Sequence, residues 1–108
     1  MAEYAVIESV QRYMRAVEKA GIPVSFAVLY GSQVQGTTHQ WSDIDLIIVS
    51  PHFDGPKRRE DSGTLWYIAS QIDSRIEPIA CGLKQWNDDT TSAIIEIARR
   101  EGQQILAA

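Results

Sequence analysis

The sequence predicts an α/β (α+β) protein built on a small mixed β-sheet of three to four strands that is covered by helices. Two apolar runs of strand length, residues 24–30 and 43–50, supply the predicted centre of this sheet. Residues 3–20 instead carry apolar side chains at steps of three and four, which is the spacing of an amphipathic helix. Helical and strand patterns then alternate along the rest of the chain, so each predicted helix has a sheet to pack against.

Length and composition predict one globular domain over residues 1–108, with 44% hydrophobic and 22% charged residues. The net charge of −4, without a long basic tract, argues against nucleic acid as a partner. Cys81 is the single cysteine, which excludes an intrachain disulfide and a cysteine-rich zinc site. The N-terminus does not read as a signal peptide and no apolar run is long enough to span a membrane, so we expect a cytoplasmic protein with no membrane partner.

The first predicted helix, residues 3–20, presents Val6 and Val10 on the face that should enter the core. Gly21 is placed to end this helix, and Pro23 prevents it from resuming. We therefore expect this segment to act in packing.

The two strands at residues 24–30 and 43–50 are apolar almost throughout, which predicts that both faces of the sheet are covered at its centre. Between them, we expect a short helix over residues 32–35 and a loop over residues 36–41.

The second half of the chain predicts, in order, a polar loop, a helix, a strand, a connection, a helix and a short strand, over residues 51–61, 62–73, 75–81, 82–89, 90–101 and 103–106. Pro78 cannot donate a ladder hydrogen bond, so its strand should lie at a sheet edge or contain an irregularity.

Asp43 and Asp45 stand at the start of an apolar strand and are two residues apart. Side chains alternate along a strand, so both carboxylates should point to one face, with their Cβ atoms about 6–7 Å apart. Such a pair repels itself unless a cation lies between its members. A solvent-exposed pair that serves solubility is the simpler alternative, but the apolar run that follows disfavours it. The pair therefore predicts a site for a hard divalent ion such as Mg²⁺.

Gly31 and Ser32 follow the preceding strand directly. A glycine there permits a tight turn and close approach of a ligand to the backbone, although it could serve the turn alone. Ser32 could be only a helix cap, but a helix N-terminus also suits a phosphate group. Together with the two aspartates, these residues predict a site for a nucleoside triphosphate.

The pattern Gly31-Ser32, ten residues, Asp43-Ile44-Asp45 closely resembles the signature of the nucleotidyltransferase superfamily, specifically its minimal single-domain members. The resemblance implies a polymerase beta-like palm fold over the single domain 1–108. It also implies an ATP substrate, one or two Mg²⁺ ions held by Asp43 and Asp45, and contacts from Gly31 and Ser32 to the nucleotide.

A third carboxylate is usual in the resembled family, and Glu77 is our candidate because it lies in a predicted strand. The resemblance implies that this acid binds metal and accepts the proton of the attacking hydroxyl. The alternative is an edge-strand glutamate in solvent, and Asp73 is the reserve candidate at the end of a predicted helix.

The resemblance implies a transferase that moves a nucleoside monophosphate, AMP from ATP, to a hydroxyl acceptor. It also implies a HEPN-type partner protein in a toxin–antitoxin pair, with a tyrosine of that partner as the acceptor. The alternative function is a catalytically weak or inactive binding subunit that neutralises its partner by contact. The base preference, the acceptor and homo-oligomerisation stay open. The basic cluster Lys57, Arg58 and Arg59 could contact pyrophosphate, but a solvated surface is the better interpretation.

Overall fold

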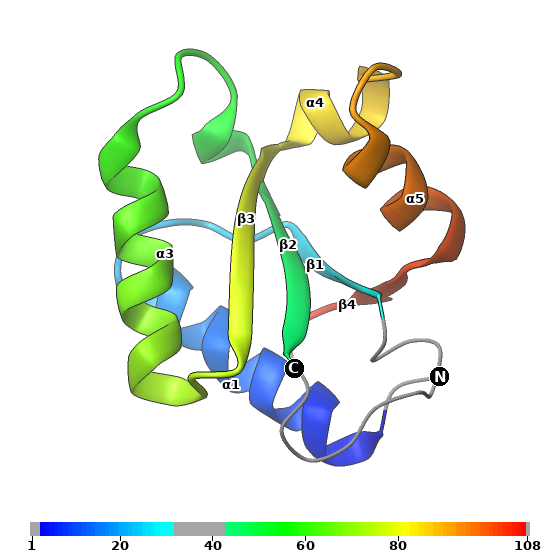
Figure 1. Cartoon of the computed structure of the whole chain (residues 1–108). Coiled ribbons are helices and arrows are strands. Elements are labelled where there is room, and N and C mark those ends of the chain that lie inside the picture. The colour runs from blue at the N-terminus through cyan, green and yellow to red at the C-terminus, as the bar shows by residue number, and fades with distance from the viewer. Residues whose placement is uncertain (1–2, 32–42, 108) are drawn as a thin grey trace.

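The computed structural model describes residues 3–31 and 43–107 of the chain (Figure 1). Its elements are α1 (Tyr4–Lys19), β1 (Phe26–Tyr30), β2 (Ile44–Ser50), the short 3-10 helix η1 (Pro51–Phe53), α3 (Arg59–Ile72), β3 (Ile76–Gly82), α4 (Leu83–Asp88), α5 (Ala93–Glu101) and β4 (Gln103–Ile105). The predicted helix over residues 32–35 and the loop over residues 36–41 lie outside the described residues.

The four strands form one mixed sheet in the order β3-β2-β1-β4. β1 pairs antiparallel with both β2 and β4, whereas β2 and β3 run parallel. The predicted fold class and the mixed sheet are therefore confirmed. β3 lies at one edge of the sheet, as the presence of Pro78 predicts.

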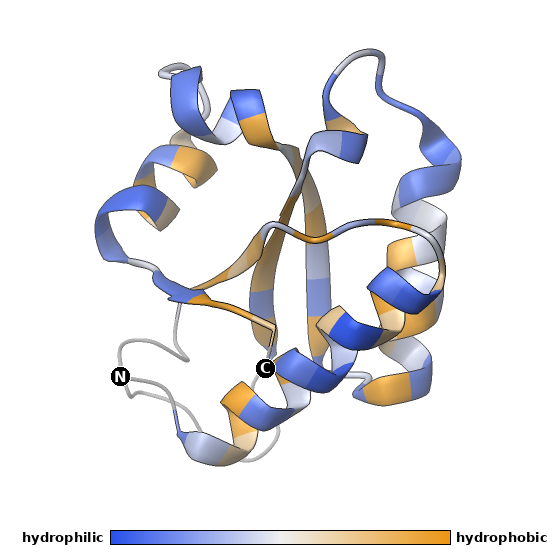
Figure 2. Cartoon of the chain, turned by 180° about the vertical axis from the view of Figure 1, so that it is seen from behind, coloured by the Kyte–Doolittle hydropathy of each residue, from blue (hydrophilic) through white to orange (hydrophobic). Residues whose placement is uncertain are grey.

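Helices cover the two faces of the sheet unequally. α1 and α3 lie across one face and enclose the larger core cluster. Figure 2 shows the molecule from the side opposite to that of Figure 1. α4 and α5 cover part of the opposite face around a smaller cluster that includes Val28, Ile47, Val49, Trp86 and Ile95. The central strands are thus buried on both faces, because each sheet face has its own apolar layer.

α1 is amphipathic as predicted, and both Val6 and Val10 are buried. Gly21 follows with a φ of 100°, a left-handed conformation that suits glycine. The buried Tyr13 hydroxyl donates a hydrogen bond of 2.9 Å to the Leu65 carbonyl, which joins α1 to α3. None of the helices within residues 3–31 and 43–107 has the length and apolar character required to cross a bilayer.

The predicted loop over residues 51–61 is wrong at both ends. Its first residues form η1, where the Ser50 hydroxyl accepts a hydrogen bond from the His52 amide. Its last residues belong to α3, whose first turn contains Glu60 and Asp61. Acidic side chains are favourable beside the positive end of a helix dipole, so this polar segment is compatible with a helix start.

Other predicted boundaries also differ from the structure. The predicted connection over residues 82–89 contains the helix α4, whose buried Trp86 packs into the smaller core cluster. β2 begins at Ile44, so Asp43 immediately precedes the strand. A single residue outside the ladder is within the ordinary uncertainty of strand ends.

Candidate active site

The sheet register aligns three polar side chains in one row. Asp45 on β2 is the partner of Tyr30 on β1 and of Glu77 on β3. Directly paired residues on neighbouring strands project from the same face, so these three side chains share one face of the sheet. Asp43 precedes this row by two residues.

The row lies at one end of the face that α4 and α5 partly cover. Ile47 and Val49 alternate with Asp45 along β2 and belong to the smaller core cluster under those helices. Glu77 is the second residue of β3, whereas α4 begins after the last residue of that strand (Figure 1). The acids therefore lie at the end of the sheet away from α4, with Asp45 partly exposed.

The acids influence one another electrostatically. Burial raises the pKa of Asp45, and the charge of Asp43 raises it further. A hydrogen bond with Asp43 is the largest cause of the raised pKa of Glu77, followed by burial and the charges of Asp43 and Asp45. None of the ion pairs formed among the described residues includes Asp45 or Glu77. The structure thus brings Asp43, Asp45 and Glu77 together as a cluster of negative potential.

Gly31 lies directly against this cluster. Its φ is +77°, and a Cβ atom added there would be 2.7 Å from Asp45 Oδ2. A side chain at this position would therefore be strained by its backbone conformation and would collide with a carboxylate oxygen. The glycine lets the chain turn beside Asp45. Ser32, the other predicted nucleotide-binding residue, lies outside the described residues.

The donor set fits a magnesium ion that also binds substrate. Within the described part of the chain, no group of three histidine, cysteine, aspartate or glutamate side chains forms a ready-made metal site. Mg²⁺ commonly takes only one or two protein carboxylates and completes its shell with water and substrate phosphates. Carboxylates with raised pKa values also gain from a dication that relieves their mutual repulsion.

The reserve candidate Asp73 has a different environment. It caps the C-terminus of α3, and its carboxylate accepts hydrogen bonds from Arg75 Nη2 at 2.7 Å and Nε at 3.0 Å. These side-chain hydrogen bonds are the largest cause of the lowered pKa of Asp73. The structure therefore uses Asp73 in an internal ion pair and brings Glu77 to the other acids.

The basic cluster is remote from the acids. Lys57, Arg58 and Arg59 follow η1, at the far end of β2 from Asp45. A strand of this length spans roughly 20 Å at about 3.3 Å per residue. Contact between this cluster and pyrophosphate at the acids is therefore excluded in this conformation, and the surface interpretation is retained.

Tyr30 is the residue at the row that the sequence did not single out. Burial raises the pKa of its phenol, and the charges of Asp45 and Glu77 raise it further. Its place directly before Gly31 was the available signal, but its pairing with Asp45 depends on strand register.

The chain combines a mixed four-stranded sheet with acids at the start of its two parallel strands, β2 and β3. Residues 10–99 match the family described as "Nucleotidyltransferase domain", and the chain belongs to that family. No curated protein matches the sequence significantly.

Two solved structures share the fold. A crystal structure of a toxin–antitoxin with AMP-PNP aligns with a TM-score of 0.60 and 21% identity, covering 91% of this chain and 73% of that chain. A protein from Sulfolobus solfataricus assigned as a nucleotidyltransferase aligns with a TM-score of 0.62 and 14% identity, covering 93% of this chain and 78% of that chain. At such low identity, these likenesses establish the fold alone.

Proposed function

We propose that the chain is a Mg²⁺-dependent adenylyltransferase that moves AMP from ATP to a hydroxyl group of a partner protein. Membership of the nucleotidyltransferase domain family supports nucleotidyl transfer. The observation that carries the proposal is the gathering of Asp43, Asp45 and Glu77 beside the backbone of Gly31.

In this proposal, Asp43, Asp45 and Glu77 supply oxygen ligands for the ion. With an ion held by these ligands, the site would supply Lewis-acid stabilisation for the charge that develops on the α-phosphate. Asp45 is held by the ladder of β2 on both sides, so its carboxylate needs little reorganisation. Gly31 leaves its backbone open to the phosphates, and Ser32 donates its hydroxyl to an outer phosphate oxygen.

Glu77 has the additional role of a general base. The acceptor oxygen attacks the α-phosphorus, the bond from that phosphorus to the bridging oxygen breaks, and pyrophosphate leaves. The acceptor proton passes to the Glu77 carboxylate. Glu77 is the partner of Asp45 in the register of β2 and β3, so its carboxylate lies at the ion site that the acceptor hydroxyl would approach.

The proposed acceptor is a tyrosine of a HEPN-type protein that forms a toxin–antitoxin pair with this chain. The similarity to a toxin–antitoxin crystallised with AMP-PNP supports both a protein partner and an adenine nucleotide. We place the pair in the cytoplasm, where ATP and Mg²⁺ are available and where a chain with one cysteine needs no oxidising environment.

The test is transfer of label from [α-³²P]ATP to a purified HEPN-type partner in the presence of Mg²⁺. We expect labelled partner with the wild-type chain and none with Asp43→Asn, because an amide is a poor ligand for a hard cation. Unchanged labelling by a folded Asp43→Asn protein would overturn the mechanism.

A contact-only binding subunit is the second candidate, and the similarity to a toxin–antitoxin crystal structure is also compatible with it. Tight binding to the partner without label, unaffected by replacing both Asp43 and Asp45 with asparagine, would support this alternative.

A further inference from the structure

β3 presents an open edge. Within the described sheet it pairs with β2 alone. The Ile44 amide donates to the Arg75 carbonyl at 2.8 Å, and this bond sets the alternation of peptide groups along the parallel ladder. Odd-numbered residues of β3 therefore direct their peptide groups toward β2, and even-numbered residues direct theirs outward.

The outward groups form a short template for another strand. The Ile76 amide already donates to the Asp73 carbonyl, and the Gly82 amide donates to Gln85 Oε1. Pro78 has no amide hydrogen. The remaining outward groups are the carbonyls of Ile76, Pro78 and Ala80 and the amide of Ala80. An added strand could thus donate three hydrogen bonds to β3 and accept one from it.

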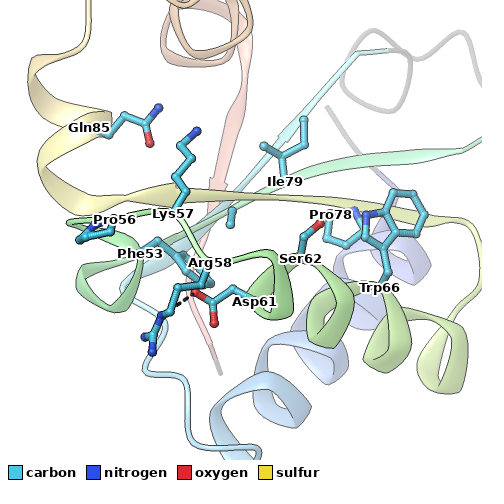
Figure 3. Close-up of a pocket in the computed structure, with 11 residues that line it drawn as sticks. Phe53, Pro56, Lys57, Arg58, Asp61, Ser62, Trp66, Pro78, Ile79 and Gln85 are labelled. Atoms are coloured by element: carbon cyan, nitrogen blue, oxygen red, sulfur yellow. Dashed lines mark ion pairs between the residues drawn. The ribbon is translucent and has the colours of Figure 1, made fainter.

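A groove of about 360 Å³ follows this same edge. α3 forms one wall with Ser62 and Trp66, and Pro78 and Ala80 of β3 line the other. In Figure 3, Trp66 and Pro78 lie at one end, and Lys57 lies toward the other end. Trp66 is 47% exposed and Ile79, on the other side of the strand, is 38% exposed. The edge is therefore flanked by apolar surface.

The end of the groove away from the acids is basic. Lys57, Arg58 and Asp61 line it, and Arg58 Nε is 3.7 Å from Asp61 Oδ2, so Lys57 supplies the net positive charge. Lys57 forms none of the ion pairs found among the described residues. A local positive charge on a chain of net charge −4 selects an acidic group in an occupant of this end.

We propose that the β3 edge and this groove bind an extended segment of a partner protein, which adds to the sheet as a fifth strand. The segment carries acidic side chains at the end beside Lys57 and apolar side chains that pack on Trp66 and Ile79. Addition of a strand provides affinity through the backbone, while the groove selects alternate side chains.

A second copy of the chain fits this edge less well. Suppose that the β3 edges of two copies pair antiparallel about a two-fold axis at Ile79. Pro78 of each copy would then lie opposite Ala80 of the other. Each of these two residue pairs would lack one hydrogen bond, because proline has no amide hydrogen to donate. A partner strand needs no donor from Pro78, since it can donate to the Pro78 carbonyl.

This docking surface is separate from the acidic row. Pro78 and Ala80 face the α1 and α3 side of the sheet, away from Glu77. Ile79 shares the Glu77 face and contributes only its apolar side chain to the docking surface. The inference therefore does not rest on nucleotidyl transfer. Asp43→Asn should leave peptide affinity unchanged even if it removes every trace of labelling.

The experiment uses the full chain and two libraries of fluorescein-labelled capped hexapeptides that are apolar at alternate positions. Each peptide of one library carries two glutamates at one of its ends, the N-terminal or the C-terminal end. Its counterpart in the matched library carries two lysines at the same positions. We expect members of the acidic library to bind at least about tenfold tighter than their lysine counterparts by fluorescence anisotropy. Binding should also slow hydrogen exchange at the Ala80 amide.

Matched variants localise the binding. Lys57→Glu and Trp66→Ala should each weaken the best acidic peptide about tenfold. Lys19→Glu on α1 and Tyr67→Ala, beside Trp66 on α3 and 67% exposed, should change its affinity less than about twofold.

Four outcomes would overturn the proposal. These are no acidic peptide with a Kd below about 1 mM, equal affinity for the lysine peptides, binding that leaves the Ala80 amide unprotected, and protection of that amide by self-association without peptide. The last result would assign the edge to a second copy of the chain.

Discussion

Two acidic regions lie close together in this chain and have opposite electrostatic character. Asp73 accepts hydrogen bonds from the Arg75 guanidinium, and its pKa is lowered. Asp45 and Glu77 lie near other acids, and their pKa values are raised. An acid that has a cation within the fold favours the folded state when ionised, whereas a carboxylate whose pKa is raised by burial and by neighbouring carboxylates disfavours it when ionised.

The comparison separates an acid with a partner inside the fold from the acids that we propose to hold the ion. Asp73 has its cation, Arg75, in the same chain, so its negative charge stabilises the connection between the end of α3 and the start of β3. Asp45 and Glu77 lower the stability of the empty protein at neutral pH, a cost that an external cation and its nucleotide would offset. Five predictions test this difference.

The largest effect should come from Asp45→Asn. If the acidic row binds the catalytic ion, this change should lower the rate of adenylyl transfer about a thousandfold. Asp73→Asn, the matched control, should change the rate less than about threefold when both proteins are assayed fully folded. Initial rates of label transfer measure both variants, and equal losses would contradict the distinction.

Gly31→Ala should destabilise the fold by about 2–3 kcal/mol. The new side chain meets both a left-handed backbone and Asp45 Oδ2 at 2.7 Å. Gly21→Ala is the control, because its φ of +100° brings the same backbone strain with nothing within 4 Å. Urea unfolding of both variants isolates the steric contribution of Asp45, and equal losses would show that the carboxylate moves aside freely.

Asp73→Asn should lower the free energy of unfolding by about 1–2 kcal/mol, because it weakens charge-assisted hydrogen bonds to a partly buried arginine. The loss should be present at neutral pH. Since the pKa of Asp73 is lowered in the fold, this contribution should disappear as the pH falls through that pKa. Urea titrations at several pH values measure it, and a loss that grows in acid would contradict the assignment.

The smallest effect should have the opposite sign. The pKa of Glu77 is raised in the fold, so the folded state keeps this proton to a higher pH than the unfolded state does. Its contribution is present in acid and is lost as the pH rises through the carboxyl range. Glu77→Gln should therefore raise the free energy of unfolding by about 0.5 kcal/mol at pH 7 and by less in acid.

Magnesium should favour the stability of the wild-type chain over that of Glu77→Gln. Added Mg²⁺ should raise the Tm of the wild-type chain more than that of Glu77→Gln, because the variant offers one fewer carboxylate. Equal shifts in a thermal melt would remove Glu77 from the ion site and leave it as an exposed edge residue.

Local pattern alone was sufficient to predict much of the fold and to place Asp43 and Asp45 together. The spacing in α1 and the apolar runs of β1 and β2 depend on side chains a few residues apart, and these elements are confirmed. The position of Asp45 two residues after Asp43 likewise needs only the alternation of a strand. The prediction of a loop over residues 51–61 was wrong at its C-terminal end because acidic side chains suit both a loop and the first turn of a helix.

Which residues from distant parts of the chain come together depends on tertiary packing. The parallel register of β2 and β3 brings Glu77 to Asp45, whereas hydrogen bonds from Arg75 hold Asp73 apart from them. Register depends on the packing of whole strands, and a shift of one residue would turn Glu77 to the other face. The same packing sets α3 beside the open edge of β3. Local patterning is therefore enough to predict most of the elements and their chemistry, and the register of the sheet determines which of them lie together.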